Sequence, residues 1–375
     1  MGWSIHHPVG LIHHTPAACY RGYTLFSTTR GGRDAYLIDM EGNIVHRWHS
    51  PEGIHYSYLL DNGNLLCRTF PPEDAGGIET VGGSSASIIE LDWDSNLVWA
   101  YRDNTLHHDY ERLPNGNTLL LQWEPLPDGL EAQVQGGFEV DFAPGMLGDV
   151  VREVTPEGAT VWEWRSWEHL DPGEDILGPL DARREWTHGN CLNVTPDGDL
   201  LVSFRLTSTV GIADRATGAF KWKWGPGEID HQHHPTWLDN GRVLIFDNGS
   251  HRRGTSFSRV VEVDPATNEI HWQYQGMPAI SFYSYNISSA ERQPNGNTLI
   301  CEGAPGRMFE VTPRGEIVWE YINPFFLYSD AAGGVGGTEY TNATFRCHRY
   351  SADHPALVGK DLDPGRHAAL NNVLR

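Results

Sequence analysis

The sequence predicts an all-β protein, a six-bladed β-propeller with four antiparallel strands in each blade. Three observations lead to this fold class. An apolar strand, a short polar turn and a strand that ends in tryptophan follow one another six times along the chain. Asn-Gly or Asp-Gly turns separate these segments, and 41 Gly and 23 Pro punctuate short apolar runs in the 375 residues. Repeats of this length are typical of propellers and solenoids.

The tryptophan-ended segments supply the two outer strands of each predicted blade. They lie at residues 35–48, 86–99, 149–164, 209–224, 258–272 and 306–319. Five hairpin turns supply the two inner strands, because Asn-Gly and Asp-Gly tolerate the positive φ angles of a tight hairpin. These turns contain Asn62, Asn115, Asp197, Asn240 and Asn295.

One blade lacks such a turn, and the two ends of the chain are expected to complete it. Residues 22–28 and 35–48 supply three strands, and residues 342–350 supply the inner strand. This arrangement closes the ring and removes exposed sheet edges. A solenoid is the alternative, but it requires atypical capping repeats, and none is visible.

Three regions follow from this assignment: an N-terminal segment at 1–21, the propeller at 22–350 and a C-terminal tail at 351–375. The longest insertion, residues 165–187, is expected to form a functional loop such as a lid, because loops of this length are uncommon in compact domains. Glu168 and Asp171 in this insertion are either an additional acid or ordinary loop polarity.

Composition limits the classes of partner. The formal net charge is −22, and no Lys/Arg cluster is long enough to follow a phosphate backbone, so we expect no nucleic-acid partner. No apolar run reaches membrane-spanning length and no secretory signal is visible, so we expect no membrane partner and a cytoplasmic protein. The alternative is a mature chain whose leader has been removed. The five cysteines are scattered without metal-ligand spacing, which indicates reduced thiols.

Histidines recur at one position of the predicted inner strands. The residue seven positions before the Asn or Asp of each turn marks the start of the strand nearest the propeller axis. These residues are His55, His108, Asn190, His233 and Ser288. His188 lies two residues before Asn190 and therefore shares its strand face. Three histidines in five equivalent positions predict a group of imidazoles around one end of the central channel.

Symmetric pairing about each turn predicts the neighbours of these residues across the hairpins. It pairs His108 with Trp123, Asn190 with Arg205, and His233 with Asn248. Neutral donors and acceptors beside one arginine suit a tetrahedral oxyanion, because the guanidinium binds sulfate or phosphate oxygens in pairs. A nearby histidine can act as nucleophile or general acid.

Other histidines are interpreted differently. His107 and His234 are expected to point away from the channel and to serve structural roles, and His231 is expected to lie nearer the channel rim. The tryptophans of the outer strands are expected to pack at the blade rims.

The sequence resembles the bacterial arylsulfate sulfotransferase family, whose members have a six-bladed propeller with an active site in the central channel. The resemblance is densest in Trp186-Thr-His188-Gly-Asn190, in the strand that ends Val202-Ser-Phe-Arg205, in Gln232-His233 and in Phe246-Asp-Asn-Gly249. It covers nearly the whole propeller. This chain is similar to a shorter, cytoplasmic relative of the characterised periplasmic enzymes.

The resemblance implies transfer of a sulfuryl group from an aryl sulfate to a phenol by a ping-pong route, without the sulfate carrier PAPS. It implies that His233 is the sulfated nucleophile and that His188, Asn190 and Arg205 hold the sulfuryl oxygens. By the same analogy, His108 exchanges the phenol proton. The expected catalytic residues are thus His233, His108, His188 and Arg205. The expected substrate-binding residues are Asn190, His55, Asn248, Gln232, Trp123 and Ser288.

Two other hypotheses remain open. The first is a metal-dependent lyase, hydrolase or oxygenase in which His55, His108, His188 and His233 bind Fe, Zn or Mn. The second is a binding propeller without catalysis. Arg205 favours a cofactor-free site over the metal site, since a cation beside a divalent metal is electrostatically unfavourable. The expected partner is a small aromatic substrate, and the expected cofactor is none.

Overall fold

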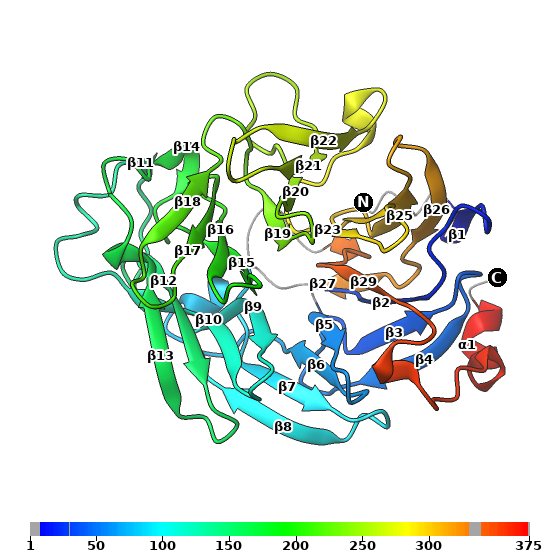
Figure 1. Cartoon of the computed structure of the whole chain (residues 1–375). Coiled ribbons are helices and arrows are strands. Elements are labelled where there is room, and N and C mark those ends of the chain that lie inside the picture. Colours follow the sequence, from blue (N-terminus) through cyan, green and yellow to red (C-terminus); the bar gives the residue numbers. More distant parts are fainter. Residues whose placement is uncertain (1–7, 30, 330–338, 374–375) are drawn as a thin grey trace. The chain divides into compact units, whose positions relative to one another are not determined.

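The computed structural model describes residues 8–29, 31–329 and 339–373. Its strands form six antiparallel sheets of four blade strands each, which is the strand topology of a six-bladed β-propeller, as predicted. The chain divides into two compact units. The first unit contains Met1–Phe70, Ser87–Tyr101 and Ile287–Arg375, and the second contains Pro71–Ala86 and Arg102–Asn286. Each unit contains three of these sheets, whose strands are labelled in Figure 1.

The second unit contains three sheets of consecutive strands. The first has the order β13-β12-β10-β9, the second β15-β16-β17-β18 and the third β19-β20-β21-β22. Their strands are β9 (Leu106–Arg112), β10 (Thr118–Pro125), β12 (Leu147–Val154), β13 (Thr160–Arg165), β15 (Gly189–Val194), β16 (Leu200–Phe204), β17 (Thr209–Ala213), β18 (Phe220–Trp224), β19 (His233–Trp237), β20 (Val243–Asp247), β21 (Arg259–Val263) and β22 (Ile270–Gln275). Every tryptophan-ended segment of this unit forms the third and fourth strands of its sheet, as predicted.

The first unit contains the sheet that was expected to combine both ends of the chain. Its order is β29-β2-β3-β4, and Tyr23 of β2 pairs with Tyr350 of β29. The strands are β29 (Cys347–Tyr350), β2 (Tyr23–Ser27), β3 (Asp34–Ile38) and β4 (Ile44–His49). The composite blade is therefore present, while closure of the ring stays a prediction.

The other two sheets of the first unit have the orders β5-β6-β7-β8 and β1-β26-β25-β24-β23. Their strands are β5 (Tyr56–Leu59), β6 (Leu65–Arg68), β7 (Ser87–Leu91), β8 (Leu97–Arg102), β23 (Ser289–Arg292), β24 (Thr298–Glu302), β25 (Arg307–Val311), β26 (Ile317–Ile322) and β1 (Gly10–His14). The N-terminal segment thus adds a fifth strand to the outer edge of one blade, which the sequence repeat did not predict. Since β1 hydrogen-bonds to β26, it covers a sheet edge.

The C-terminal tail contains the short helices η5 (Pro355–Leu357), η6 (Pro364–His367) and α1 (Ala368–Val373). Asn371 of α1 bonds to both the backbone N–H and the backbone carbonyl of Ile44, which fixes the tail against β4. The remaining short elements are β27 (Leu327–Ser329) paired with β28 (Glu339–Thr341), and η2 (Ile78–Thr80) and η4 (Ala279–Ser281). In the described part of the chain, no helix has the length and apolar character needed to cross a membrane.

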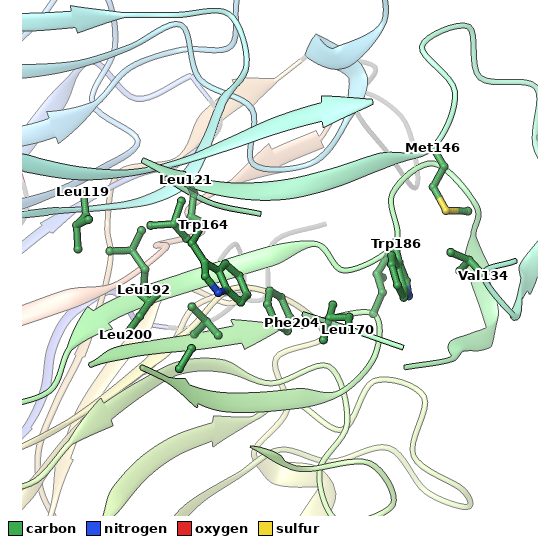
Figure 2. Close-up of a cluster of buried hydrophobic side chains, with 14 of the residues drawn as sticks. Leu119, Leu121, Val134, Met146, Trp164, Leu170, Trp186, Leu192, Leu200 and Phe204 are labelled. Carbon is green, nitrogen blue, oxygen red and sulfur yellow. The ribbon is translucent and has the colours of Figure 1, made fainter. Parts of the chain in front are cut away.

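A continuous apolar core joins the first two sheets of the second unit. Leu119 and Leu121 of β10 face Leu192, Leu200 and Phe204 of the next sheet, with Trp164 between them (Figure 2). The long insertion contributes to the same core. Within it, η3 (Ser166–Glu168) is followed by β14 (Leu177–Ala182), which pairs in parallel with β11 (Gly136–Phe138). Trp186 is fully buried and donates its indole N–H to the carbonyl of Asp175 at 2.7 Å. The insertion is therefore a packed segment, and its role as a lid stays a prediction.

Candidate functional site

The innermost strands of the second unit lie side by side and bring the predicted histidines together. Strand β15 contacts both β9 and β19. The side chain of Asn190 donates to the carbonyl of Gln232 at 2.8 Å, and the backbone N–H of Leu192 donates to Asp109 at 3.0 Å. We use the term histidine cluster for His107, His108, His188, His231, His233 and His251, with their polar neighbours in this unit.

Several histidines of the second unit have left-handed backbone conformations. The φ angles are 43° at His108, 53° at His188, 55° at His231 and 50° at His234. Non-glycine residues rarely adopt positive φ, and single residues of this kind occur where the chain makes a bulge or a sharp turn. The histidines therefore lie at points where the inner strands depart from regular pairing.

The bulges correct the pairing that was expected from the turns. Trp123 donates its backbone N–H to Thr105 rather than lying opposite His108. Arg205 donates its backbone N–H to His188 at 3.2 Å, while Asn190 is skipped in the register. His233 pairs with Phe246, two residues from the expected partner. Symmetric counting about a turn assumes a regular ladder, and each bulge adds a residue to one strand.

His108 lies at the end of a chain of polar side chains. Its Nδ1 is 3.0 Å from Nδ1 of His107, whose Nε2 is 3.2 Å from the buried carboxylate of Asp149. Burial opposes ionisation of Asp149, but hydrogen bonds from His107, Thr187 and Gly189 hold its pKa below the usual value. If His107 carries its proton on Nε2 toward this carboxylate, His108 donates through Nδ1 and has its lone pair on Nε2. His107 also stacks on Trp123 at 4.0 Å, so it is both a packing residue and a polar link.

Gly83 provides the space for the ring of His108. It has φ +93°, and a Cβ atom there would lie 2.0 Å from Cε1 of His108. The backbone N–H of His108 donates to the carbonyl of Gly83 at 2.9 Å. A residue with a side chain at position 83 would displace the imidazole.

His188 forms a buried pair with Glu185. The distance from Nδ1 to the carboxyl oxygen is 2.5 Å, and the rings of His188 and His108 are 4.4 Å apart. Burial, and then the charge of Arg205, lowers the pKa of His188 to about 3. Burial, and then the charge of Asp149, raises the pKa of Glu185 to about 8. The pair therefore retains one ionisable proton at neutral pH.

His231 lies between two carboxylates. Its Nδ1 bonds to Asp230 and its Nε2 lies 3.0 Å from Asp181 of the insertion. Burial disfavours the charged ring, but hydrogen bonds to Asp181 and Asp230 raise the pKa of His231 above its ordinary value. Both ring nitrogens lie against carboxylate oxygens, so neither is available to attack a substrate.

In His233, unlike His231, the oxygen acceptors lie at one ring nitrogen, Nδ1. Its Nδ1 is 2.8 Å from Oδ1 of Asn248 and 3.2 Å from the carbonyl of His231. The amide nitrogen of Asn248 donates to the carbonyl of Ser284 at 2.8 Å, which fixes the direction of its oxygen. Two oxygen acceptors at Nδ1 require the proton there, so the neutral ring has its lone pair on Nε2.

Arg205 is a partly exposed cation. Its charge acts on two pairs of residues, His188 with Glu185 and His231 with Asp181. It lowers the pKa of His188 and of Asp181. Within residues 8–29, 31–329 and 339–373, its guanidinium makes no hydrogen bond or ion pair. Its own pKa is lowered by burial, yet an arginine remains charged at neutral pH. A guanidinium without an ion pair, near the neutral ring of His188, is suited to bind an oxyanion.

Gln232 and Trp123 have extensive contacts with the scaffold. The amide nitrogen of Gln232 donates to Ser203, to the carbonyl of Phe204 and to the carbonyl of Thr209, each at 3.0 Å or less. Trp123 is fully buried against His107. Both residues support the histidine cluster, and their role in substrate binding stays a prediction.

His55 and Ser288 belong to the first unit. Nε2 of His55 accepts from the backbone N–H of Gly31 at 3.4 Å, and its ring packs against Phe70 with centroids 5.1 Å apart. Ser288 accepts from the backbone N–H of Gly303 at 2.9 Å. The structure brings His108, His188, Asn190, Arg205, His233 and Asn248 into one unit, while the participation of His55 and Ser288 stays a prediction.

One group of residues in the described ranges has the geometry of a metal site. The potential ligand atoms of Asp181, His231 and His251 all lie within 4.8 Å of one another. This group shares no member with the predicted alternative set of His55, His108, His188 and His233. Among the described residues it is the only group of three or more His, Cys, Asp or Glu that meets this distance.

The chain matches the arylsulfotransferase (ASST) family over residues 28–229 and 228–323, which is most of its length. The chain belongs to this family. Membership identifies a transferase-type enzyme and agrees with the resemblance in the motifs around His188, Arg205 and His233. A search of curated proteins found no match.

Solved structures with similar folds are distant in sequence. A protein of unknown function from Bacteroides caccae has 13% identity and a TM-score of 0.53, with 87% of this chain and 98% of that chain covered. A streptogramin B lyase has 12% identity and a TM-score of 0.48 over 92% of this chain and 93% of that one. A protein from Desulfotomaculum acetoxidans has 11% identity and a TM-score of 0.47 over 86% and 99%. At this level of identity the likeness concerns the fold alone.

Sequence reasoning missed several residues that lie at the histidine cluster. These are Asp149, Asp181, Glu185, Asp230 and His251. The insertion was flagged by its length, but Glu168 and Asp171, the acids considered in it, are exposed, whereas Asp181 and Glu185 are buried. No signal in a single sequence separates these carboxylates, because burial depends on how the insertion folds back. His107 and His231, assigned structural or rim positions, are members of the cluster.

Proposed function

We propose that this ASST-family protein transfers a sulfuryl group from an aryl sulfate to a phenol through a sulfohistidine at His233, without PAPS. The observation that carries the proposal is the fixed tautomer of His233. Asn248 and the carbonyl of His231 both accept at Nδ1, so Nε2 has the lone pair that a nucleophile needs. His231, two residues away, has both nitrogens directed at carboxylates and is unsuited to this role.

Arg205 supplies the charge that the sulfuryl group requires. Its guanidinium has forked N–H donors and no protein carboxylate within ion-pair distance among the described residues. Donors fixed in advance stabilise the oxygens of the transferring group at low reorganisation cost. In this proposal Asn190 and the neutral His188 assist it, and no metal or cofactor is required.

The first half-reaction forms one bond and breaks one. The Nε2 lone pair of His233 attacks sulfur, the sulfur–oxygen bond to the aryl group breaks, and the phenolate leaves and takes the proton from Nε2 of a protonated His108. The N–S bond of sulfohistidine is now present. In the second half-reaction an acceptor phenol gives its proton to Nε2 of His108 and attacks sulfur, which breaks the N–S bond and restores His233. The chain from Asp149 through His107 to His108 supports His108 as the base.

The test is mass spectrometry of the protein after exposure to p-nitrophenyl sulfate without an acceptor. We expect one added SO₃ group per chain, located at His233, and its loss when a phenol is added. The variant His233→Ala should remain unmodified. Release of p-nitrophenol with no modified residue would rule out the sulfohistidine route, and a label on a different histidine would move the nucleophile.

A further inference from the structure

Asp181, His231 and His251 converge on one point from three separate segments of the second unit. Asp181 lies near the end of the insertion strand β14, His231 precedes β19, and His251 follows β20. Oδ1 of Asp181 is 3.0 Å from Nε2 of His231 and 3.6 Å from Nδ1 of His251. The two imidazole rings are 4.1 Å apart. One carboxylate oxygen thus faces two ring nitrogens.

The spacing fits two or more ligands on one metal ion. Two ligands of a tetrahedral ion at about 2.0–2.1 Å are separated by roughly 3.4 Å. The two measured separations lie on either side of this value. By contrast, 3.6 Å is too long for a hydrogen bond between His251 and Asp181.

Unsatisfied polar atoms provide a second, independent observation. Nδ1 of His251 and Oδ2 of Asp181 are buried atoms with no hydrogen-bond partner among the described residues. Asp181 as a whole is only 5% exposed. A buried carboxylate oxygen and a buried ring nitrogen without partners are costly, so such atoms usually have a ligand, a water or an ion.

The surrounding groups hold the ligands in position. Nδ1 of His231 bonds to Asp230, which leaves Nε2 directed at Asp181. The same carboxylate of Asp230 accepts the backbone N–H of His251 at 3.0 Å, and the backbone N–H of Asp230 donates to Asp247 at 2.9 Å. A histidine ligand whose other nitrogen bonds to a carboxylate is the usual arrangement in protein metal sites.

We propose that Asp181, His231 and His251 bind one divalent transition-metal ion of the zinc class. Two imidazoles and one carboxylate suit Zn²⁺, Co²⁺, Mn²⁺ or Fe²⁺ and leave at least one coordination position open. Asp181 and Asp230 together offset the charge of the ion, which reduces the repulsion from Arg205. The set excludes His233 and His108, so this proposal does not rest on the proposed sulfuryl transfer.

The competing arrangement contains no metal. In it, a protonated His231 bridges Asp181 and Asp230, and His251 only packs against them. Both arrangements keep the segments together, and they differ in whether a metal binds with one-to-one stoichiometry.

The experiment is a Co²⁺ titration of the full chain after treatment with a chelator, followed by visible absorption and calorimetry. We expect one Co²⁺ per chain with the visible spectrum of a site of low coordination number, displaced by one equivalent of Zn²⁺. His251→Ala should weaken binding by at least about tenfold, and Asp230→Asn by roughly 10–100-fold, as for other residues that orient a ligand. His271→Ala is the matched control, because His271 lies on β22 and is 3.8 Å from Asp264.

Absence of stoichiometric Co²⁺ binding by the folded wild-type chain would overturn the proposal and leave the protonated bridge. Equal Co²⁺ affinity of the His251→Ala variant and the wild type would show that His251 is not a ligand and would overturn the proposed ligand set. Since His251 is partly exposed, its truncation should be tolerated; circular dichroism and the melting temperature verify folding. If His251→Ala does not fold, Asp181→Asn, which keeps the shape of the side chain, serves as the second variant. Loss of sulfuryl transfer does not test this proposal, because the proposed metal ligands do not include His233 or His108.

Discussion

The two units of the molecule place different chemistry at equivalent positions of their inner strands. In the second unit, His188 pairs with Glu185, His233 with Asn248, and His108 reaches Asp149 through His107. In the first unit, the inner strands contact aromatic rings and cations, and Arg349 of β29 bonds to the buried carboxylate of Glu310 at 3.2 Å. Arg346 lies 4.8 Å from the ring of Tyr56, and Arg68 lies 4.8 Å from the ring of Phe345.

The comparison teaches that a repeated histidine acquires its chemistry from what surrounds it. His348 of the first unit is partly buried, and burial followed by the charge of Arg346 lowers its pKa to about 3. His231 of the second unit is buried, yet hydrogen bonds to two carboxylates raise its pKa. Two of the four carboxylates at the histidine cluster, Asp181 and Glu185, come from one insertion, and the other two are Asp149 and Asp230. The fold repeats, but the insertion does not.

The largest difference between the units should appear on removal of one histidine from each. We expect His233→Ala to reduce aryl-sulfate turnover by at least ~10³-fold, because it removes the proposed nucleophile. We expect His55→Ala to keep kcat within about tenfold of wild type and to act mainly on KM, since His55 is a predicted substrate-binding residue with no proposed bond to the sulfuryl group. The measurement is p-nitrophenol release, with melting temperatures as the folding control. Equal losses for the two variants would remove the distinction between the units.

A second test uses the pH dependence of stability for the His188–Glu185 pair. The pair binds one proton in the folded chain up to the raised pKa of Glu185, about 8. Unfolded, it binds one proton between about pH 4.5 and 6.5, on the histidine, and none above. The folded state therefore binds one more proton between about pH 6.5 and 8, so stability falls as pH rises there, by on the order of 2 kcal/mol. The change of stability with pH depends only on the total number of protons that the pair binds in each state, and not on which residue carries the proton.

The same counting covers the acidic side. Below about pH 4.5 the unfolded pair binds two protons and the folded pair one, since the pKa of His188 is lowered to about 3, so stability also falls as pH falls. Glu185→Gln should abolish the fall between about pH 6.5 and 8 while keeping the side-chain shape. Chemical denaturation of both proteins at several pH values measures this. Parallel curves would show that the pair does not carry the extra proton.

The smallest expected effect distinguishes two glycines of the second unit. Gly83 (φ +93°) faces the ring of His108, whereas Gly129 (φ +79°) has no atom within 4 Å of its added Cβ. Both Gly→Ala changes strain the backbone, by about 1–3 kcal/mol. Only Gly83→Ala should also displace His108 and lower turnover. Kinetics and denaturation of the two variants therefore separate the effect of the His108 ring position from the effect of backbone strain. Normal kinetics for Gly83→Ala would show that the position of His108 is unimportant.

Sequence reasoning predicted the sheets because strand period, turn type and terminal tryptophan are local features. It also singled out His108 and His233 from equivalent positions of the repeat, and the structure places both in one unit with His188 and Arg205, while their catalytic roles stay predictions. It placed the register across the hairpins wrongly, because bulges are set by single residues with positive φ, although the side chains of His233 and Asn248 do bond to each other. Strand β1 and the buried carboxylates were missed for a related reason. Their positions depend on contacts with segments far away in the chain, which no local pattern encodes.

The positive φ angles of His108 and His234 affect whether such residues are retained during evolution. Glycine adopts positive φ freely, so replacing His108 or His234 by glycine would relax a backbone conformation that costs of order 1–3 kcal/mol in a residue with a side chain. Selection for stability alone would therefore erode these imidazoles. A sequence that retains them gives up folding free energy at those positions, and relatives that lost the chemistry are expected to carry glycine or asparagine where this chain has histidine.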